Sequence, residues 1–183
     1  MLFPEKIIKK FYKIEEGNSF RRVFFTMLIG SGFAIITSLT IIIPVFIENL
    51  FKIPKIPSYP MNYILSIPLT AAGLFFMLWS NISFIKAKGT PVPVNPPPVL
   101  ITSGPFAFSR NPMHGGMFLL LFGLGIYYGS LLSVFLFIPL YIFLDIQILK
   151  KIEEPELEKR LGEEYIVYKK RTPMFLGWRM RVK

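Results

Sequence analysis

Long apolar tracts, and not short alternating patterns, dominate this chain. Charged side chains are nearly absent from residues 23–47, 61–85 and 113–144. Each tract reaches or exceeds the roughly 20 residues that a helix needs to cross about 30 Å of hydrocarbon. Core helices of soluble proteins rarely remain uncharged over such lengths. The pattern therefore indicates an integral membrane protein and disfavours a large soluble enzyme.

The third tract is too long for a single crossing and predicts a helical hairpin. Its middle, residues 127–130, reads Tyr-Tyr-Gly-Ser, which combines interface aromatics with a turn former. We expect two helices there, near residues 113–127 and 131–150, and the first is short for a full crossing. Together with the first two tracts, the hairpin predicts an all-α membrane protein with four to five transmembrane helices.

Amphipathic sequence flanks the apolar tracts at both ends of the chain. Between Phe3 and Ile14, apolar residues recur at helical spacing with lysines between them, as in helices that lie in the membrane interface. After Leu149 the sequence becomes charged and predicts a carboxy-terminal helical region. We expect residues 1–85 to form the interfacial helix and the first two spans. Residues 86–183 then contain a proline-rich loop, the hairpin and the carboxy-terminal region.

The distribution of lysine and arginine predicts the orientation of the spans. There are six in residues 1–22, two in 48–60, three in 86–112, none in 127–130 and ten in 150–183. Four crossings alternate with these counts, and cytoplasmic segments carry the excess. We therefore expect both termini and the loop before the hairpin in the cytoplasm. The formal net charge of +10 is then a topology signal, and no nucleic-acid motif accompanies it.

Cysteine and histidine usage limits the chemistry. The chain has no cysteine and a single histidine, His114. This excludes disulfides, thiolate nucleophiles and metal motifs that need two histidines, so we expect no metal site. The lack of cysteine also fits a site on the reducing, cytoplasmic side of the membrane.

The loop of residues 86–112 is rich in proline, with five prolines between Pro91 and Pro98. Proline disfavours regular helix and sheet and favours extended chain. The loop also contains Val94, Val99 and other apolar residues. Two interpretations stay open here: a plain linker, and an extended segment that buries alternate apolar residues and walls a pocket.

Polar residues stand at the two ends of the hairpin: Arg110 before it and the pair Glu153-Glu154 after it. Ionisable groups beside a bilayer are costly and mark functional sites. Arg110 is suited to binding a carboxylate through two hydrogen bonds, and an ionised Glu153 is suited to an ammonium or sulfonium group. The alternatives are a lipid-phosphate anchor for Arg110 and, for the glutamates, charge stabilisation of a helix N-terminus beside Lys150 and Lys151.

Several motifs along residues 86–175, about half of the chain, resemble one enzyme family. In order, they are Leu100-Ile101-Thr102-Ser103-Gly104-Pro105-Phe106, Arg110-x-Pro112-Met113-x-x-Gly116, the apolar hairpin, Glu153-Glu154, Leu161-Gly162-Glu163-Glu164-Tyr165 and Tyr168-Lys169-Lys170-Arg171-Thr172-Pro173. Their order and membrane setting resemble the isoprenylcysteine carboxyl methyltransferases, whose relatives include phospholipid N-methyltransferases.

The resemblance implies a membrane methyltransferase that uses S-adenosylmethionine. It implies a lipidic substrate that enters from the bilayer and a cofactor enclosed by the carboxy-terminal region at the cytoplasmic end of the hairpin. By position, Arg110 and Glu154 correspond to catalytic residues. The residues that match cofactor-contacting positions are Leu100, Ile101, Phe106, Asn111, Pro112, Met113, His114 and Glu153.

Two departures from the family pattern affect the expected roles of individual residues. The family usually has His at position 111 and Tyr at position 114, where this chain has Asn111 and His114. Asn111 cannot take up a charge, whereas His114 can titrate. A carboxylate acceptor needs no base, whereas an amine needs one, with Glu154 or His114 the nearest candidates. Because the chain has no clearly isolated general base, we expect the carboxylate of an isoprenylated cysteine as the acceptor. The alternatives are a phospholipid amine, a nicotinamide-dependent membrane reductase and a non-catalytic scaffold.

Overall fold

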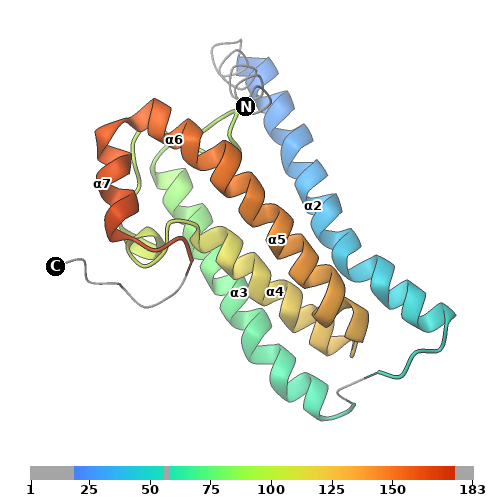
Figure 1. Ribbon diagram of the computed structural model, residues 1–183. Coiled ribbons are helices and arrows are strands. Elements are labelled where there is room, and N and C mark those ends of the chain that lie inside the picture. Colours follow the sequence, from blue (N-terminus) through green and yellow to red (C-terminus); the bar gives the residue numbers. More distant parts are fainter. Residues whose placement is uncertain (1–18, 56–57, 176–183) are drawn as a thin grey trace. The chain divides into compact units, whose positions relative to one another are not determined.

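The computed structural model describes residues 19–55 and 58–175, and every regular element within these ranges is helical (Figure 1). The expected all-α fold is confirmed. The predicted interfacial helix between Phe3 and Ile14 lies outside the described residues.

Three of the described helices are long and apolar enough to cross a membrane. They are α2 (Ser19–Leu50), α3 (Met61–Lys86) and the continuous helix Ser133–Leu161. Their outward side chains are strongly apolar, as for Phe143, which is 58% exposed. Such a surface is stable against lipid and not against water. The chain is therefore an integral membrane protein.

The predicted hairpin is present, and its break falls at the Tyr-Gly-Ser sequence of residues 128–130. Its first helix, α4 (Pro112–Tyr127), has 16 residues and is about 24 Å long at 1.5 Å per residue. That is short for an untilted crossing, as the sequence predicted. The number of full crossings, four to five, stays a prediction.

The second arm of the hairpin is one helix with two wider turns. A π-helical turn, η2 (Ser133–Phe137), leads into α5 (Ile138–Ile148), and a second one, η3 (Leu149–Glu153), leads into α6 (Glu154–Leu161). Pro155 follows this second wider turn inside the continuous helix, where it donates no backbone hydrogen bond. The last helix is α7 (Glu163–Arg171).

The described chain forms two compact units, each discontinuous in sequence. The first unit comprises residues 19–33, Trp79–Pro112 and 146–175. The second comprises Ala34–Leu78, apart from residues 56–57, and Met113–Asp145. The predicted two-part division, residues 1–85 and 86–183, follows the order of the chain and stays a prediction.

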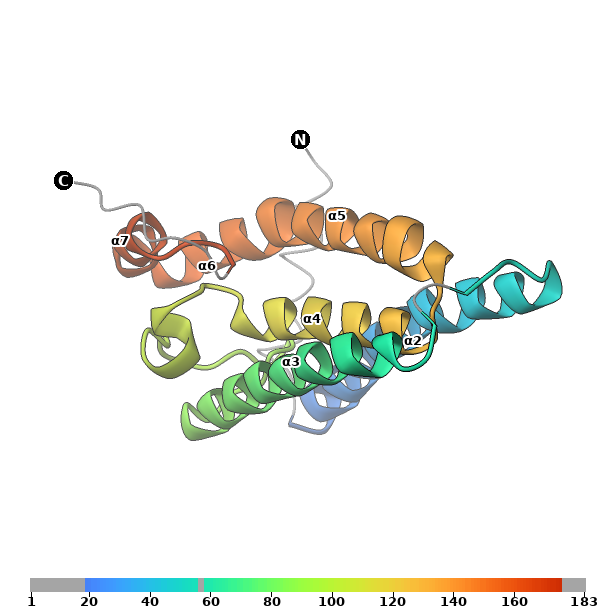
Figure 2. The same cartoon turned by 90° about the horizontal axis from the view of Figure 1, so that it is seen from below.

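Glycines bring α3 and α4 close together within the second unit (Figure 2). A Cβ added to Gly73 would lie 2.6 Å from the carbonyl oxygen of Gly116 and 2.6 Å from the backbone nitrogen of Leu120. One added to Gly123 would collide with Thr70. Small residues permit such close backbone approach in membranes. The glycines of the hairpin therefore serve helix packing.

Replacing Gly73 by alanine should lower the free energy of unfolding by about 1–3 kcal/mol, because the new methyl group meets backbone atoms that cannot move aside. Gly32→Ala is the matched control, since its Cβ would have nothing within 4 Å. The free energy of unfolding of that control should rise by up to about 1 kcal/mol, because alanine has a higher helix propensity than glycine. Thermal unfolding of both variants in detergent tests this, and equal shifts in both would contradict the packing role.

A buried carboxylate holds the turn of the hairpin in the second unit. Glu48 is 1% exposed, and its Oε1 accepts the backbone N–H of Leu132 at 2.6 Å. Ser130 Oγ accepts the N–H of Ser133 at 3.0 Å. Both contacts bind donors at the start of the last long helix that have no partner within the helix. An acidic residue at the end of an apolar tract was the sequence signal for this cap.

Part of the proline-rich loop is folded back on itself and does not form the extended segment considered from sequence. It is a compact turn in the first unit, in which the N–H and hydroxyl of Thr90 donate to the carbonyl of Asn95 at 2.8 and 2.9 Å. Val94 is fully buried, whereas Val99 is 59% exposed, so apolar side chains do not alternate along an extended wall. Backbone hydrogen bonds stabilise the turn, and local composition does not reveal them.

Candidate functional site

An ion-pair cluster in the first unit joins α6, α7 and the loop before α4. Glu154 receives hydrogen bonds from Arg110 Nη2 and from Lys169 Nζ, each at 2.7 Å. The Glu154 and Arg110 side chains are only 8% and 12% exposed. A buried carboxylate requires such partners, since an unpaired charge would cost several kcal/mol (about 3–5). The sequence-predicted catalytic residues Arg110 and Glu154 therefore contact each other directly.

A wider helical turn precedes Glu154. In η3 the backbone N–H of Glu154 donates to the carbonyl of Leu149, five residues earlier, in place of the α-helical spacing of four. The extra residue rotates α6 about its axis relative to the preceding helix. Turns of this kind are frequent at functional sites.

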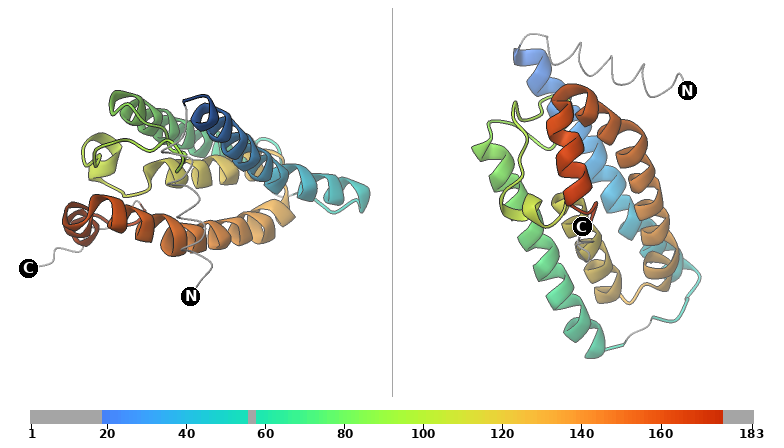
Figure 3. Two further views of the ribbon diagram at one scale, coloured as in Figure 1. Left: turned by 90° about the horizontal axis from the view of Figure 1, so that it is seen from above. Right: turned by 60° about the vertical axis from the view of Figure 1, so that its left-hand side comes forward.

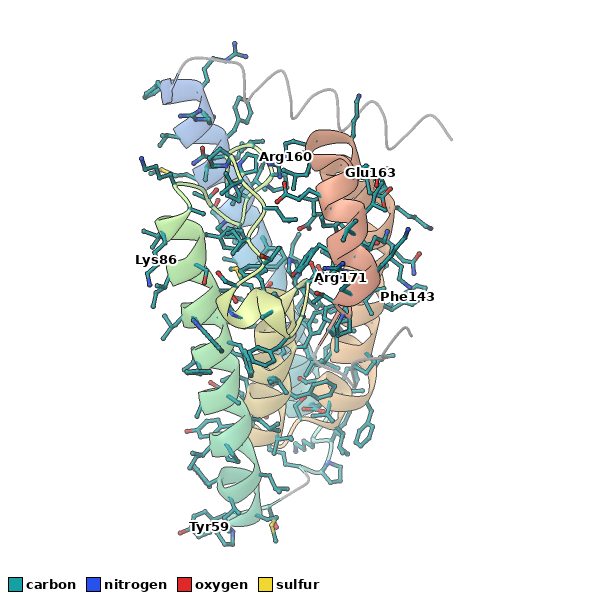
Figure 4. All side chains as sticks on the ribbon, turned by 90° about the vertical axis from the view of Figure 1, so that its left-hand side faces the viewer. Tyr59, Lys86, Phe143, Arg160, Glu163 and Arg171 are labelled. Atoms are coloured by element: carbon teal, nitrogen blue, oxygen red, sulfur yellow. The ribbon has the colours of Figure 1, made fainter. Side chains whose placement is uncertain are left out.

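The α6–α7 corner lets the chain return toward the loop. Gly162 has a φ of 59°, in the left-handed region that glycine adopts readily. Arg160 and Glu163 lie at this corner, and Arg171 lies at the opposite end of α7 (Figure 4). Arg160 contacts Glu156 at 2.8 Å and donates to the carbonyl of Pro97 at 2.9 Å. This links α6 to the proline-rich turn.

Lys169 connects Glu154 with the more exposed Glu158, at 2.8 Å. Partial burial lowers the pKa of Lys169, but its hydrogen bonds to the two carboxylates together outweigh that effect and raise the pKa above 10.5. A raised folded-state pKa stabilises the fold below the unfolded value and loses that contribution as the pH rises above it. The contribution of Lys169 to the cluster is therefore present throughout the neutral range and is lost in strong alkali.

Helix α7 also holds the segment η1 (Gly104–Ala107) and the residues after it (Figure 3). The hydroxyl of Tyr168 donates to the carbonyl of Phe106 at 2.7 Å, and Arg110 Nη1 donates to the carbonyl of Lys169 at 2.7 Å. Burial raises the pKa of Tyr168, so the hydroxyl stays a donor at any ordinary pH. Phe106 itself packs edge-on against Phe84, with ring centroids 5.4 Å apart.

Removing the Tyr168 hydroxyl should loosen this contact. Tyr168→Phe leaves the Phe106 carbonyl without its donor and is expected to cost about 1 kcal/mol of unfolding free energy. Limited proteolysis should cut near α7 faster in this variant than in the wild type. A matched Tyr63→Phe variant, at an exposed ring, should leave the cleavage rate unchanged; equal rates in all three proteins would refute the contact.

The residues around Arg110 bind the segment that follows α7. The backbone N–H of Arg110 donates to the carbonyl of Pro173 at 2.8 Å. The carbonyl of Met174 accepts hydrogen bonds from Ser109 Oγ at 3.0 Å and from the Asn111 side chain at 3.3 Å. Asn111 therefore orders the carboxy-terminal segment, a role that its amide can fill without taking up a charge.

The structure divides the sequence-predicted site residues between the two units. The first unit contains Leu100, Ile101, Phe106, Arg110, Asn111, Pro112, Glu153 and Glu154, and the second contains Met113 and His114. Burial and the negative charge of Glu154, with a smaller effect of Glu153, raise the pKa of Tyr165. Glu153 therefore lies close enough to α7 for its charge to act on Tyr165.

Three residues with site contacts were missed from sequence: Lys169, Tyr168 and Asp145. Lys169 and Tyr168 belong to a charged, helical stretch in which no single residue stands out. Asp145 carried a clear signal, an acidic residue inside an apolar helix. Its Oδ2 lies 2.7 Å from Nδ1 of His114 in the second unit.

One donor of the cluster points at no acceptor. The Nε–H of Arg110 is buried and has no hydrogen-bond partner among the described residues. Buried N–H groups almost always find a partner. The site can therefore accept an oxygen from a bound anionic group at this position.

Comparison with known proteins gives one match. The family model for phospholipid methyltransferases matches residues 61–164, more than half of the chain. The matched segment runs from the start of α3 into α7 and includes Arg110, His114 and the Glu153-Glu154 pair. No curated protein and no solved structure matches the chain.

Proposed function

Because the chain belongs to the phospholipid methyltransferase family and is therefore a membrane methyltransferase, we propose that it methylates a lipid amine with S-adenosylmethionine as donor. The family match carries this proposal, since it takes in both ends of the hairpin together with the polar residues there. It supports methyl transfer over the reductase and the scaffold considered from sequence.

The residues of the first unit fit such a donor at one observable point. S-Adenosylmethionine, when bound, supplies a methyl group activated by a positively charged sulfur. The orphaned Nε–H of Arg110 suits its carboxylate, or the phosphate of the lipid. Glu153, beside the cluster, suits its ammonium or sulfonium charge. Two further sequence-predicted contacts, Leu100 and Ile101, are half-buried in the same unit.

Glu154 then acts by positioning and not as a base. Its carboxylate already binds two cations, Arg110 and Lys169, so its task is to hold the guanidinium in place. Methyl transfer from a sulfonium depends mainly on alignment of donor and acceptor, and alignment lowers such barriers by about 7–11 kcal/mol.

The second candidate acceptor is the carboxylate of an isoprenylated cysteine. This was the acceptor expected from the sequence. The observation that favours it is the same Arg110 Nε–H, which would bind a carboxylate acceptor as well as a phosphate. The proposed orientation, with both termini and this site on the cytoplasmic side, rests on the lysine and arginine counts.

Calorimetric titration of the detergent-purified protein with S-adenosylhomocysteine tests the proposal. Saturable binding of this product, with no binding of reduced nicotinamide cofactor in a parallel titration, is expected. Binding of the nicotinamide alone would assign the chain to the reductases, and no binding of either would leave a scaffold.

A further inference from the structure

The second unit contains a histidine–aspartate pair. Nδ1 of His114, in the first turn of α4, lies 2.7 Å from Oδ2 of Asp145 in α5. The Asp145 side chain is 6% exposed, within an otherwise apolar helix. Acidic residues inside membrane segments are costly and mark functional positions. The His114 side chain is 22% exposed, so the pair is within reach of a ligand.

Packing between α4 and α5 fixes the pair. The rings of Phe118 and Tyr141 lie 6.4 Å apart, and the Tyr141 hydroxyl donates to Met117 Sδ at 3.4 Å. The hydroxyl of Thr37 on α2 lies 3.1 Å from that of Tyr141. Tyr141 stands one turn before Asp145 and is a titratable side chain that interacts with it electrostatically.

The hydrogen bond sets the tautomer of the histidine. A carboxylate accepts the proton on Nδ1, which makes Nε2 the nitrogen that carries the lone pair. The carboxylate also fixes the orientation of the ring. Imidazole ordinarily titrates near neutral pH, as an effective general base should.

We propose that His114 is the general base of the reaction and that Asp145 is its positioning residue; this inference rests on the proposed function. A lipid primary amine is mostly protonated at neutral pH and cannot attack in that form. Its ammonium nitrogen gives one proton to Nε2 of His114. The lone pair left on nitrogen forms the new carbon–nitrogen bond while the methyl–sulfur bond breaks, and that bonding pair stays on sulfur. His114 then passes the proton to water.

The histidine–aspartate pair changes the acceptor expected from the sequence. The lack of an identifiable base favoured a carboxylate acceptor, which needs none. Asp145 turns His114 into such a base, and the position is one at which the related enzymes usually carry a tyrosine. The pair therefore favours an amine as the acceptor.

The test compares the wild-type full chain with His114→Gln and Asp145→Asn in nanodiscs that contain phosphatidylethanolamine. Transfer of labelled methyl groups is followed from about pH 6 to about pH 10 at saturating donor, so weaker donor binding does not lower the rate. We expect His114→Gln to lose about 10²–10⁴-fold at neutral pH. Its remaining rate should rise with pH toward the pKa of the amine. In Asp145→Asn, the pH dependence of the transfer rate should be shifted relative to that of the wild type.

The lone histidine permits a second measurement that does not depend on turnover. A ¹⁵N NMR spectrum of histidine-labelled protein contains one imidazole, whose two nitrogens report the tautomer. We expect the neutral ring to carry its proton on Nδ1, and Asp145→Asn to increase the Nε2–H form. A wild-type ring with its proton on Nε2 would overturn the inference.

The outcomes separate the two proposals. An active wild type whose pH profile is unchanged in His114→Gln would overturn the base while leaving methyl transfer in place. Methylation of a farnesylcysteine carboxylate with none of the amine would overturn both the base and the amine acceptor, while leaving methyl transfer itself in place. A wild type that neither binds S-adenosylhomocysteine nor transfers methyl groups would overturn the proposed function and the inference with it.

Discussion

Glu154→Gln should lower the free energy of unfolding by about 3 kcal/mol, more than any other conservative change in the first unit. The substitution keeps the shape of the side chain but removes the charge that compensates the buried Arg110 guanidinium, 12% exposed, and Lys169. Equilibrium unfolding in a mixed detergent measures the change.

Glu158→Gln is the matched control for that variant. Glu158 binds the same lysine at 2.8 Å, but its side chain is 40% exposed. Exposed ion pairs contribute about 0–1 kcal/mol, so this variant should stay close to the wild type. Equal losses in Glu154→Gln and Glu158→Gln would contradict the idea that burial makes Glu154 special.

A double variant separates stability from activity. Replacing Arg110 by methionine together with Glu154 by leucine removes both buried charges at once. Such replacements of buried ion pairs are often neutral or stabilising. The double variant should therefore recover most of the stability lost in Glu154→Gln and yet remain inactive. Recovery of activity as well would show that Arg110 does not bind donor or acceptor.

Much of the fold could be predicted because lipid imposes a simple rule on sequence. A helix in hydrocarbon must satisfy its backbone internally and carry few charges, so the tracts of residues 23–47 and 61–85 were readable as α2 and α3. The break of the hairpin at residues 128–130 was readable because interface aromatics and glycine coincide there. Arg110 and Glu154 were singled out for a related reason: ionised groups beside an apolar tract need a partner.

The contacts of the site depend on how distant segments meet, and no local pattern encodes that. Lys169 lies in a helix with cations and anions at many positions, and only the fold shows which of them reaches Glu154. The turn at Thr90 was missed because proline content indicates what a backbone avoids and not which hydrogen bonds it makes. Asp145 was visible as a lone charge, but its partner His114 is 31 residues away.

Glu153→Gln should weaken S-adenosylhomocysteine binding by about 10–100-fold, since hydrogen bonds to charged groups contribute about 1.5–3 kcal/mol. Unlike Glu154, Glu153 is only half-buried, so its loss should leave the unfolding free energy nearly unchanged. Calorimetric titration and thermal unfolding on the same sample measure both quantities. Glu164→Gln, at an exposed position of α7, is the control and should alter neither.

The alternative role of Glu153, charge stabilisation at the start of α6, predicts the reverse pattern. A carboxylate that only favours a helix N-terminus contributes about 0.3–1 kcal/mol to stability and nothing to ligand affinity. A small loss of thermal stability with unchanged affinity in Glu153→Gln would therefore remove Glu153 from the cofactor site. Because Glu153 and Glu154 are neighbours, opposite effects of the two substitutions would show that one carboxylate serves the ligand and the other the fold.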